Sequence, residues 1–314
     1  MLSFLRLVQN ENMKLYKRKI LWIMIGILVG IVIVSLVITL NTKDMHSTDW
    51  KEYLNLKIQE NQKELSDSRL PEAFKERFKE DINIKKYHIK HNIPPLYNDT
   101  AIGFVNSTLK YSGLITLFII IISSSIVSQE YSWGTIKLVL MRPVKRWVVL
   151  LSKYISVIYN SLVLFVVLIL ISFFIGSIIF GFNDTSLRYV YAKQGDINDV
   201  SIFTHFIQYI GSKLVGIIVI TAFAFMLSTI LRNNAVAIAL SIFIQFSGSV
   251  ISDVLISFDN NFTKYIFFIN MDLYQYVEGS PPEGMTLGFS IVVLFIYLLI
   301  FIGISTAIFE RRDV

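Results

Sequence analysis

Long apolar stretches alternate with polar segments along this chain, and six of them are about as long as a bilayer-crossing helix, roughly 20 residues. We therefore predict an all-α membrane protein with six transmembrane helices. The predicted helices cover residues 20–40, 111–128, 147–181, 206–231, 235–258 and 287–309. The second has the shortest fully apolar centre, and the third stretch is longer than one crossing requires. This pattern excludes a soluble single-domain enzyme.

The longest polar segment, residues 41–110, has the periodicity of two amphipathic helices. Its apolar residues recur at helical spacing: Trp50, Leu54, Ile58, Phe74, Phe78 and Ile82. Asp49 and Glu52 resemble a capping box at its start, and the helices are expected to end before Pro94. We predict an extracellular helical hairpin between the first and second transmembrane helices. Two interpretations of it remain, a helical spacer and a lid that contacts substrate.

The shorter segments are predicted from their positions between the spans. They are a cytoplasmic interfacial helix at 1–19, a short cytoplasmic helix at 129–146, an extracellular loop at 182–205, an extracellular or re-entrant segment at 259–286 and a cytoplasmic tail at 310–314. In the first of them, Leu2, Leu5 and Val8 have basic residues behind them, which fits an amphipathic helix lying in the interface. A basic flank that precedes the first span is an equally good interpretation.

Lysine and arginine counts predict the orientation of the spans. The N-terminus, the loops after the second and fourth spans and the C-terminus share one side, and with their immediate flanks, which include Lys153, they hold 13 basic against four acidic residues. The remaining segments hold 16 basic and 19 acidic residues, so the net charge of +6 combines +9 on one side with −3 elsewhere. We therefore place both termini in the cytoplasm. The Lys-, Ile- and Asn-rich composition is typical of bacteria, so the predicted location is the bacterial plasma membrane.

Composition and missing motifs exclude several kinds of functional site. The chain is 54% hydrophobic and has no cysteine, which excludes a disulfide framework, a cysteine-ligated zinc site and a thiol nucleophile. It has no G-x-x-x-x-G-K-[ST] loop and no H-E-x-x-H motif, so we predict no catalytic residue, metal site or cofactor in it. His88 and His91 are a weak metal signal, and a solvated helix is the better interpretation. The 12 bases and 11 acids of residues 41–110 nearly cancel, which argues against nucleic-acid binding.

The cytoplasmic segment 130–146 combines an apolar helix with flanking charge, EYSWGTIKLVLMRPVKR. Thr135 can begin a helix after the flexible Gly134, and Pro143 ends it before the next span. The apolar residues between positions 136 and 141 are exposed unless something covers them. A partner protein and the lipid headgroups are equally good candidates for that cover.

This segment resembles a family signature, E-x-x-x-G-T-[IL]-K-x-x-[LV]-x-x-P-[VI]-x-R, which lies between the second and third spans of type-2 ABC exporter permeases. The ending Phe309-Glu-Arg311-Arg312-Asp313-Val resembles the F-x-R-R-D-[IV] ending of the same group. The chain is similar in this respect to bacterial antibiotic-resistance and bacteriocin-immunity permeases. Many of those have a short loop where this chain has residues 41–110, so the resemblance does not extend to the substrate.

The resemblance implies a division of labour between subunits. Such a permease pairs with a separate ABC ATPase subunit in two copies, which binds ATP and magnesium, and with a second copy of itself or a homologous permease. ATPase coupling would rest on Glu130 at a hinge and on the coupling helix after it: Gly134, Thr135, Lys137, Arg142, Pro143 and Arg146. The basic residues there, with Lys145, would meet acidic ATPase residues or anionic membrane lipid.

Charges at membrane depth mark further candidate sites. Lys213 and Asp253 lie 20 residues on either side of Asn233, in the turn between the fourth and fifth spans. At ~1.5 Å per residue both are about 30 Å from that turn. We predict an intramembrane charge pair or an outer vestibule, with separate snorkelling to the interface as the alternative. Gly26 and Gly30 form a G-x-x-x-G pair suited to helix packing, within the chain or in a permease dimer.

Two functions are compatible with these features. The first is the transmembrane permease subunit of an ATP-driven ABC exporter that moves an amphipathic peptide, antibiotic or lipid-like substrate by alternating access. The alternative is a non-transport membrane sensor or assembly factor that binds a ligand or partner through the extracellular hairpin. We do not expect the chain to be an enzyme by itself, because it lacks ATPase motifs.

Overall fold

A computed structural model provides the geometry of the chain. The residues that it describes are 2–42, 50–66, 71–136, 141, 144–182, 186–193, 195–231, 233–256, 262–279, 281–282 and 284–311.

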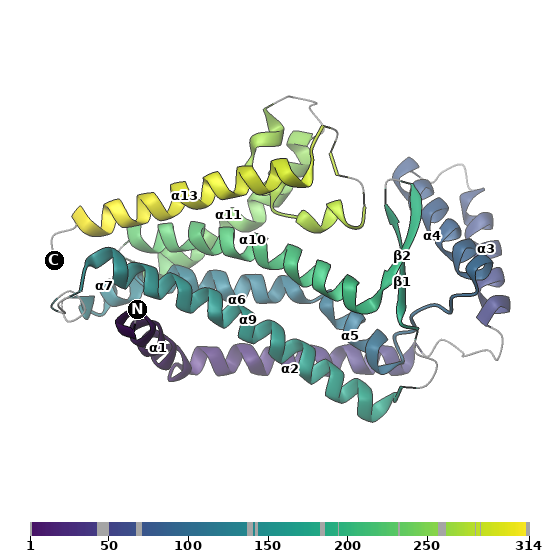
Figure 1. Ribbon diagram of the computed structural model, residues 1–314, viewed down its shortest axis with the longest axis horizontal. Coiled ribbons are helices and arrows are strands. Elements are labelled where there is room, and N and C mark those ends of the chain that lie inside the picture. Colours follow the sequence, from purple (N-terminus) through teal and green to yellow (C-terminus); the bar gives the residue numbers. More distant parts are fainter. Residues whose placement is uncertain are drawn as a thin grey trace.

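Long helices packed side by side form the body of the molecule, and both termini lie at the same end of it (Figure 1). The long apolar helices are α2 (Lys19–Asn41), α6 (Ser112–Ser125), α9 (Arg146–Ile179), α10 (Ile202–Ile230), α11 (Asn234–Ile256) and α13 (Leu287–Arg311). We call the end that holds the termini the terminal end. The opposite end carries the polar helices α3 (Trp50–Leu65) and α4 (Glu72–His91) and is called the hairpin end.

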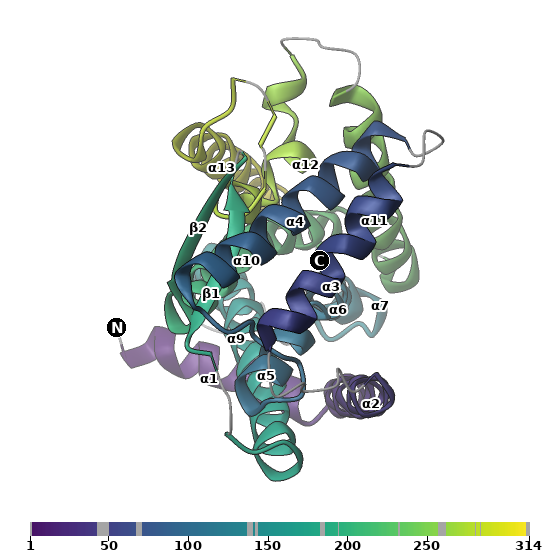
Figure 2. The same ribbon diagram turned by 90° about the vertical axis from the view of Figure 1, so that its right-hand side faces the viewer.

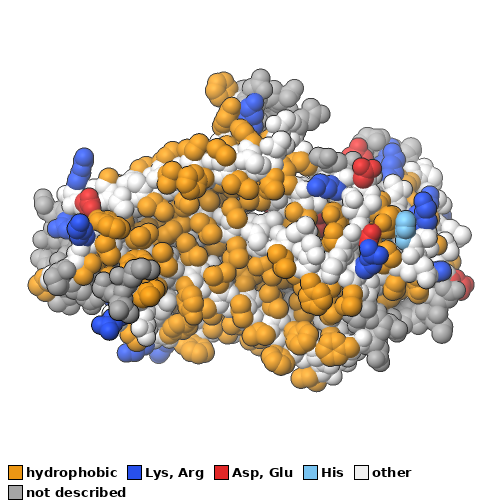
Figure 3. Space-filling model, in the orientation of Figure 1, with side chains coloured by type: hydrophobic (Ala, Val, Ile, Leu, Met, Phe, Trp, Pro, Cys, Tyr) orange, Lys and Arg blue, Asp and Glu red, His pale blue; other side chains and the backbone are white. Residues whose placement is uncertain are grey.

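Five helices among the described residues are long and apolar enough to cross a bilayer: α2, α9, α10, α11 over Asn234–Ser252, and α13. The helices α5 (Ala101–Leu109) and α6 are bent by 48° relative to each other and are long and apolar enough only when taken together, as a broken span or a re-entrant loop. Hydrophobic side chains cover the middle of the molecule, and charged side chains gather toward its two ends (Figure 3). The prediction of a mostly helical, multi-pass membrane protein is confirmed at this level.

The bent pair begins earlier than the predicted second span, which started at residue 111. Its first helix, α5, contains hydroxyl and amide side chains that lower its apparent apolarity. Ser107 and Thr108 bond to carbonyl oxygens of their own helix, each at 2.8 Å, which allows them to lie in an apolar environment. Packing against α9 is close, because a Cβ at Gly176 would lie 3.1 Å from the carbonyl oxygen of Ala101.

A two-stranded antiparallel sheet at the hairpin end departs from the all-α prediction (Figure 2). Its strands are β1 (Arg188–Lys193) and β2 (Asp196–Ser201), within the segment that we predicted as a loop at 182–205. Aromatic and β-branched residues of β1 favour a strand, and Gly195 turns the chain with a φ of +87°.

The helix α4 is docked on this sheet by one shared carboxylate. The Tyr87 hydroxyl donates a hydrogen bond to Asp199 at 2.8 Å, and the Arg188 guanidinium lies 2.6 Å from the same side chain. The predicted helical hairpin therefore forms one unit with a segment that follows it by more than 90 positions in the sequence.

Three short helices occupy the described part of segment 259–286, which we predicted as extracellular or re-entrant. They are η1 (Thr263–Tyr265), α12 (Phe267–Asn270) and η2 (Leu273–Tyr276). The buried Asn270 amide donates to the carbonyl oxygens of Lys264 and Ile266, each at 2.8 Å, and accepts from Ser290 at 2.7 Å. These bonds tie α12 and the residues just before it to α13.

The G-x-x-x-G pair of α2 faces outward. Gly26 and Gly30 are exposed, and a Cβ built on either meets nothing within 4 Å. The pair therefore makes no close helix contact within the described chain, and its use in a permease dimer stays a prediction.

Candidate functional site

The segment that carries Glu130 forms a short helix, α7 (Ser128–Ser132), at the terminal end (Figure 1). It ends in a tight turn at Gly134, whose φ is +70° and whose N–H donates to the Tyr131 carbonyl oxygen at 3.1 Å. A side chain rarely adopts this left-handed conformation, which explains the glycine. The chain turns at Gly134, four residues after Glu130, and Ile136 just beyond the turn is buried in the hydrophobic core.

Glu130 belongs to a group of four charges, three buried and one, Lys14, partly exposed. We call the group the terminal ion cluster: Glu11, Lys14, Glu130 and Lys153. The Lys153 ammonium, fully buried, lies 2.8 Å from a Glu11 oxygen and 2.6 Å from a Glu130 oxygen. Lys14 lies 2.7 Å from Glu11 and 3.3 Å from Glu130. Three elements distant in the sequence, α1 (Leu2–Tyr16), α7 and α9, are thereby joined at one point.

Further hydrogen bonds between side chains extend the same junction. Arg18 donates to the Gln129 side chain at 2.5 Å, and Asn160 donates to the Asn12 side chain at 2.9 Å. Ser156 also donates to Asn12. The face of α1 that looks toward α9 is therefore polar, which is why this helix docks against the bundle through hydrogen bonds and ion pairs as well as apolar contacts.

The electrostatics of the cluster depend on removing charges from water. Burial by itself raises the pKa of Glu11, but the ammonium groups of Lys153 and Lys14 outweigh it, and the pKa of Glu11 is lowered overall. One oxygen of Glu130 is buried and has no hydrogen-bond partner among the described residues. The cluster is held by its charges, so its stability depends on the Glu11 carboxylate being ionised.

A pH dependence follows from the lowered pKa of Glu11. A carboxylate with a depressed folded-state pKa stabilises the fold above its unfolded pKa, and this contribution is lost as the pH falls through the folded-state value. We expect the melting-temperature difference between wild type and Glu11→Gln to be largest near neutral pH. It should shrink once the pH falls below the ordinary glutamate value of 4.5. Thermal unfolding in detergent from about pH 7 to 3 measures it.

Glu60→Gln is the matched control, because the Glu60 side chain is 61% exposed and its ion pair among the described residues is with Lys57, one turn away. Its melting temperature should track that of wild type at every pH. A Glu11→Gln difference that stays constant down to pH 3 would show that the ionised carboxylate of Glu11 does not stabilise the fold.

The other predicted coupling residues divide into two groups. Thr135 donates to the Glu130 carbonyl oxygen at 3.4 Å, and Arg146 at the start of α9 donates to the Glu310 carbonyl oxygen at 3.0 Å. Lys137, Arg142 and Pro143 lie outside the described residues.

The sequence alone does not identify three residues of the terminal ion cluster as site residues. Glu11, Lys14 and Lys153 contribute there only to the charge count that predicts the orientation of the spans. Lys153 is the seventh residue of the predicted span 147–181 and could have been recognised as a charge within an apolar stretch. No local pattern indicates that its partners are Glu11 and Glu130.

Hydroxyl groups tie α6 and α7 to the two helices beside them at the terminal end. The Ser228 hydroxyl of α10 accepts from the backbone N–H groups of Val127 and Ser128, at 3.2 and 3.0 Å. The Ser128 hydroxyl donates to Asn234 at the start of α11 at 3.2 Å. A displacement of α7 would therefore reach α6, α10 and α11 directly.

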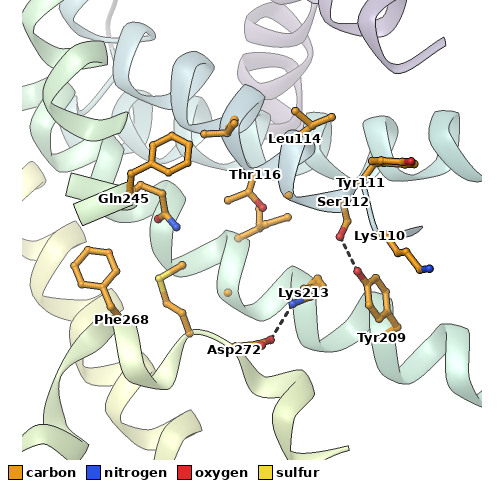
Figure 4. A pocket seen from close by; sticks show the side chains of 16 residues that line it. Lys110, Tyr111, Ser112, Leu114, Thr116, Tyr209, Lys213, Gln245, Phe268 and Asp272 are labelled. Carbon is orange, nitrogen blue, oxygen red and sulfur yellow. Dashed lines mark hydrogen bonds and ion pairs between the residues drawn. The ribbon is translucent and has the colours of Figure 1, made fainter. Parts of the chain in front are cut away.

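Lys213 occupies a second polar position, nearer the hairpin end. Its ammonium lies 2.8 Å from Asp272, just before η2, while the side chain of Asp253 lies outside the described residues, so the predicted pair with Asp253 stays untested. The Lys213–Asp272 pair lies at a cavity of about 650 Å³ between α6, α10, α11 and α12 (Figure 4). No group of three histidine, aspartate or glutamate residues in the described part of the chain could hold a metal ion.

Comparisons with known proteins place the chain in a family. The family described as "Protein of unknown function (DUF2705)" matches residues 77–314. "Uncharacterized protein YhcI" of Bacillus subtilis (strain 168) is 35% identical over 315 residues, 99% of each chain. "Uncharacterized membrane protein YdbK" of the same strain is 29% identical over 219 residues, 69% of this chain and 85% of the relative. The chain belongs to the DUF2705 family.

Proposed function

We propose that this chain is the transmembrane permease subunit of an ATP-driven ABC exporter, in which a separate ATPase acts on the segment that follows α7. The observation that carries the proposal is the terminal ion cluster. Glu130, four residues before the turn at Gly134, forms a buried ion pair with Lys153 of α9, and Lys153 also pairs with Glu11 of α1. A second, partly exposed pair joins Glu130 to Lys14 of α1. A force on the segment after Gly134 is therefore transmitted to α1, which leads into the long apolar helix α2, and to the long apolar helix α9.

Transmission of the force depends on how strongly the ion pairs resist separation, which differs between buried and exposed pairs. An exposed pair is flexible and contributes little, whereas separating Lys153 from its carboxylates would leave charges stranded in a buried site. The junction of α1, α7 and α9 therefore moves as one body. Through Ser128 and Ser228 the same movement reaches α10 and α11, which line the cavity. Alternating access would follow from closing and opening that cavity.

The terminal end also offers a surface for the partner. Trp133 is 63% exposed and Met141 is 72% exposed, on either side of the apolar run in the predicted coupling helix. Large apolar side chains exposed beside basic residues are typical of a protein contact. In this proposal the ATPase binds ATP and magnesium, and two ATPases and two permeases form the transporter.

The proposal sets the orientation and the cargo class. The terminal end is cytoplasmic, the hairpin end is extracellular, and the bent pair of α5 and α6 completes six spans in a bacterial plasma membrane. The cargo is an amphipathic peptide, antibiotic or lipid-like molecule, because the cavity joins an apolar lining to a few charged groups.

Co-purification with an ATPase encoded beside this chain tests the proposal. We expect a detergent-stable complex whose ATP hydrolysis changes on adding an amphipathic peptide or lipid. Trp133→Ala should weaken the complex by roughly tenfold, as expected for the loss of one central aromatic contact. Trp22→Ala is the control, because Trp22 is similarly exposed at 62% but lies on the apolar helix α2.

Two results would contradict the proposal. One is a permease that purifies without any ATPase although both are co-expressed. The other is equal loss of the complex in the two tryptophan variants. The first result would favour the alternative function, a membrane sensor or assembly factor that binds its ligand through the docked unit of α3, α4, β1 and β2.

A further inference from the structure

The cavity beside Lys213 lies where helices that touch at the terminal end diverge. Toward the terminal end, α6 is bonded to α10 through Ser123 and the Thr221 carbonyl oxygen at 2.8 Å. Nearer the hairpin end the same helices enclose about 650 Å³, together with α11 and the turn after α12. This volume lies within the range of about 300–1,000 Å³ that is usual for small-molecule sites.

The charged groups of this cavity are unbalanced. Its lining contains two lysines, Lys110 and Lys213, against one acid, Asp272. Lys213 bonds to Asp272 at 2.8 Å, and the Asp272 side chain is 59% exposed. Lys110 lies at the edge of the cavity beyond Tyr209 and makes no ion pair within the described part of the chain (Figure 4). The cavity therefore has a positive rim at one side.

Most of the remaining lining is apolar. Leu117, Ile217, Phe246, Phe268 and Met271 face the space between the helices. Phe246 is 56% exposed on a candidate membrane span, so this part of the lining borders the surface that contacts lipid tails.

One polar side chain lines the cavity on its apolar side. The Gln245 side chain points into the space between the helices (Figure 4). A carboxamide can donate to or accept from a polar group of a ligand. The cavity therefore favours an occupant that carries a polar group on this side.

We infer that this cavity binds an amphiphile with an acidic group. The acidic group lies between Lys110 and Lys213, the apolar part lies against Phe246, Phe268 and Met271, and a hydroxyl or amide of the ligand meets Gln245. An acidic group compensates the second lysine, whereas a cationic amphiphile would add a third positive charge. The inference gives the substrate class of the exporter proposed above and rests on that proposal for the transport step alone.

The glycines of α6 and α10 allow this site to be closed without disturbing the core. Gly113 lines the cavity, and a Cβ at this position meets nothing within 4 Å. Gly211 on α10 is equally open but is absent from the lining. Gly113→Leu therefore places a side chain in the cavity, and Gly211→Leu adds the same side chain outside it.

Binding is measured on the purified full-length chain in a neutral maltoside detergent, without any ATPase, by native mass spectrometry. The probes are lysophosphatidylglycerol, lysophosphatidylcholine and inorganic phosphate. We expect the acidic lysolipid to bind roughly tenfold more tightly than the zwitterionic one, the scale of one charge-assisted contact. Gly113→Leu should weaken the acidic lysolipid by about tenfold or more through steric exclusion, and Gly211→Leu should match wild type. Lys110→Gln should reduce the preference for the acidic probe.

Several outcomes would overturn the inference. They are equal affinity for both lysolipids, displacement of the acidic lysolipid by an equal concentration of phosphate, and unchanged binding in Gly113→Leu. If Gly113→Leu does not fold, Thr116→Phe fills the cavity from the next turn of α6 and is judged by the same criterion. The two proposals fail separately. If the chain does not bind the acidic lysolipid but co-purifies with an ATPase, the inference fails and the exporter proposal stands. If it binds the lysolipid but no ATPase co-purifies with it, the site stands and the exporter proposal fails.

Discussion

Replacing Lys153 with methionine is expected to destabilise the protein by about 3–5 kcal/mol, because it removes one partner of a buried ionic group and leaves the others charged. The Glu11 and Glu130 side chains are each 7% exposed and would lose an ammonium at 2.8 and 2.6 Å. Lys14, which is 37% exposed, is too solvated to replace it. Since proteins are stable by only about 5–15 kcal/mol, the folded yield in detergent should fall sharply.

The matched control is Lys14→Met, which removes a charge of the same kind from a solvated position. It should cost about 1 kcal/mol or less, because exposed ion pairs are screened by water. A double variant, Lys153→Met with Glu130→Gln, should recover part of the loss by removing one stranded charge. Melting temperatures and the amount of monodisperse protein measure all three. If Lys153→Met melts like Lys14→Met, the buried lysine is not what joins α1, α7 and α9.

Replacing Gly134 with proline is expected to abolish coupling to the ATPase while the spans remain folded. Proline cannot adopt the φ of +70° and lacks the N–H that bonds to Tyr131 at 3.1 Å. It also disfavours the helical conformation of Trp133. The strain, about 3 kcal/mol, falls on an exposed turn and would redirect the segment after it. ATPase stimulation and export should fall at least roughly tenfold, the factor that corresponds to about 1.4 kcal/mol.

The control is Gly181→Pro, which places the same substitution at a glycine of similar φ just after the C-terminal end of α9. Gly181 has a φ of +73°, follows a helical residue and donates its N–H to the Gly176 carbonyl oxygen at 3.3 Å. The two variants should lose similar stability, but only Gly134→Pro should lose coupling. Wild-type export by Gly134→Pro would remove the segment after α7 from the mechanism. Equal loss in both variants would mean that coupling responds to general destabilisation.

The membrane helices were predictable because their cause is local. A helix in lipid satisfies its backbone hydrogen bonds within its own segment, so an uninterrupted apolar run of sufficient length is enough to specify it. The run from 147 to 181 corresponds to the single helix Arg146–Ile179, and the run from 287 to 309 to Leu287–Arg311. The predicted second span, 111–128, coincides at its start with α6, whereas α5 before it was not predicted because it contains Ser107 and Thr108, whose hydroxyls bond within the helix.

The β hairpin was not predictable from the same signal. Each of its strands has only six residues, and the second, Asp196–Ser201, is mostly polar. Its alternation is too short to separate from a loop, and two strands by themselves are marginal in water. The contact of Asp199 with Tyr87 on α4 adds the support that the strands need, and it depends on the tertiary structure.

The sequence by itself determined that this chain is a helical membrane protein and where most of its candidate spans lie. It also identified Glu130 and Lys213 as candidate site residues. Only the tertiary structure decided which charges meet. Lys153 pairs with Glu11, 142 positions away, and Lys213 bonds to Asp272, 59 positions away. Apolarity and helix length act within a segment and can be read along the chain. The partner of a charge depends on which helix faces pack together, and that is a property of the whole fold.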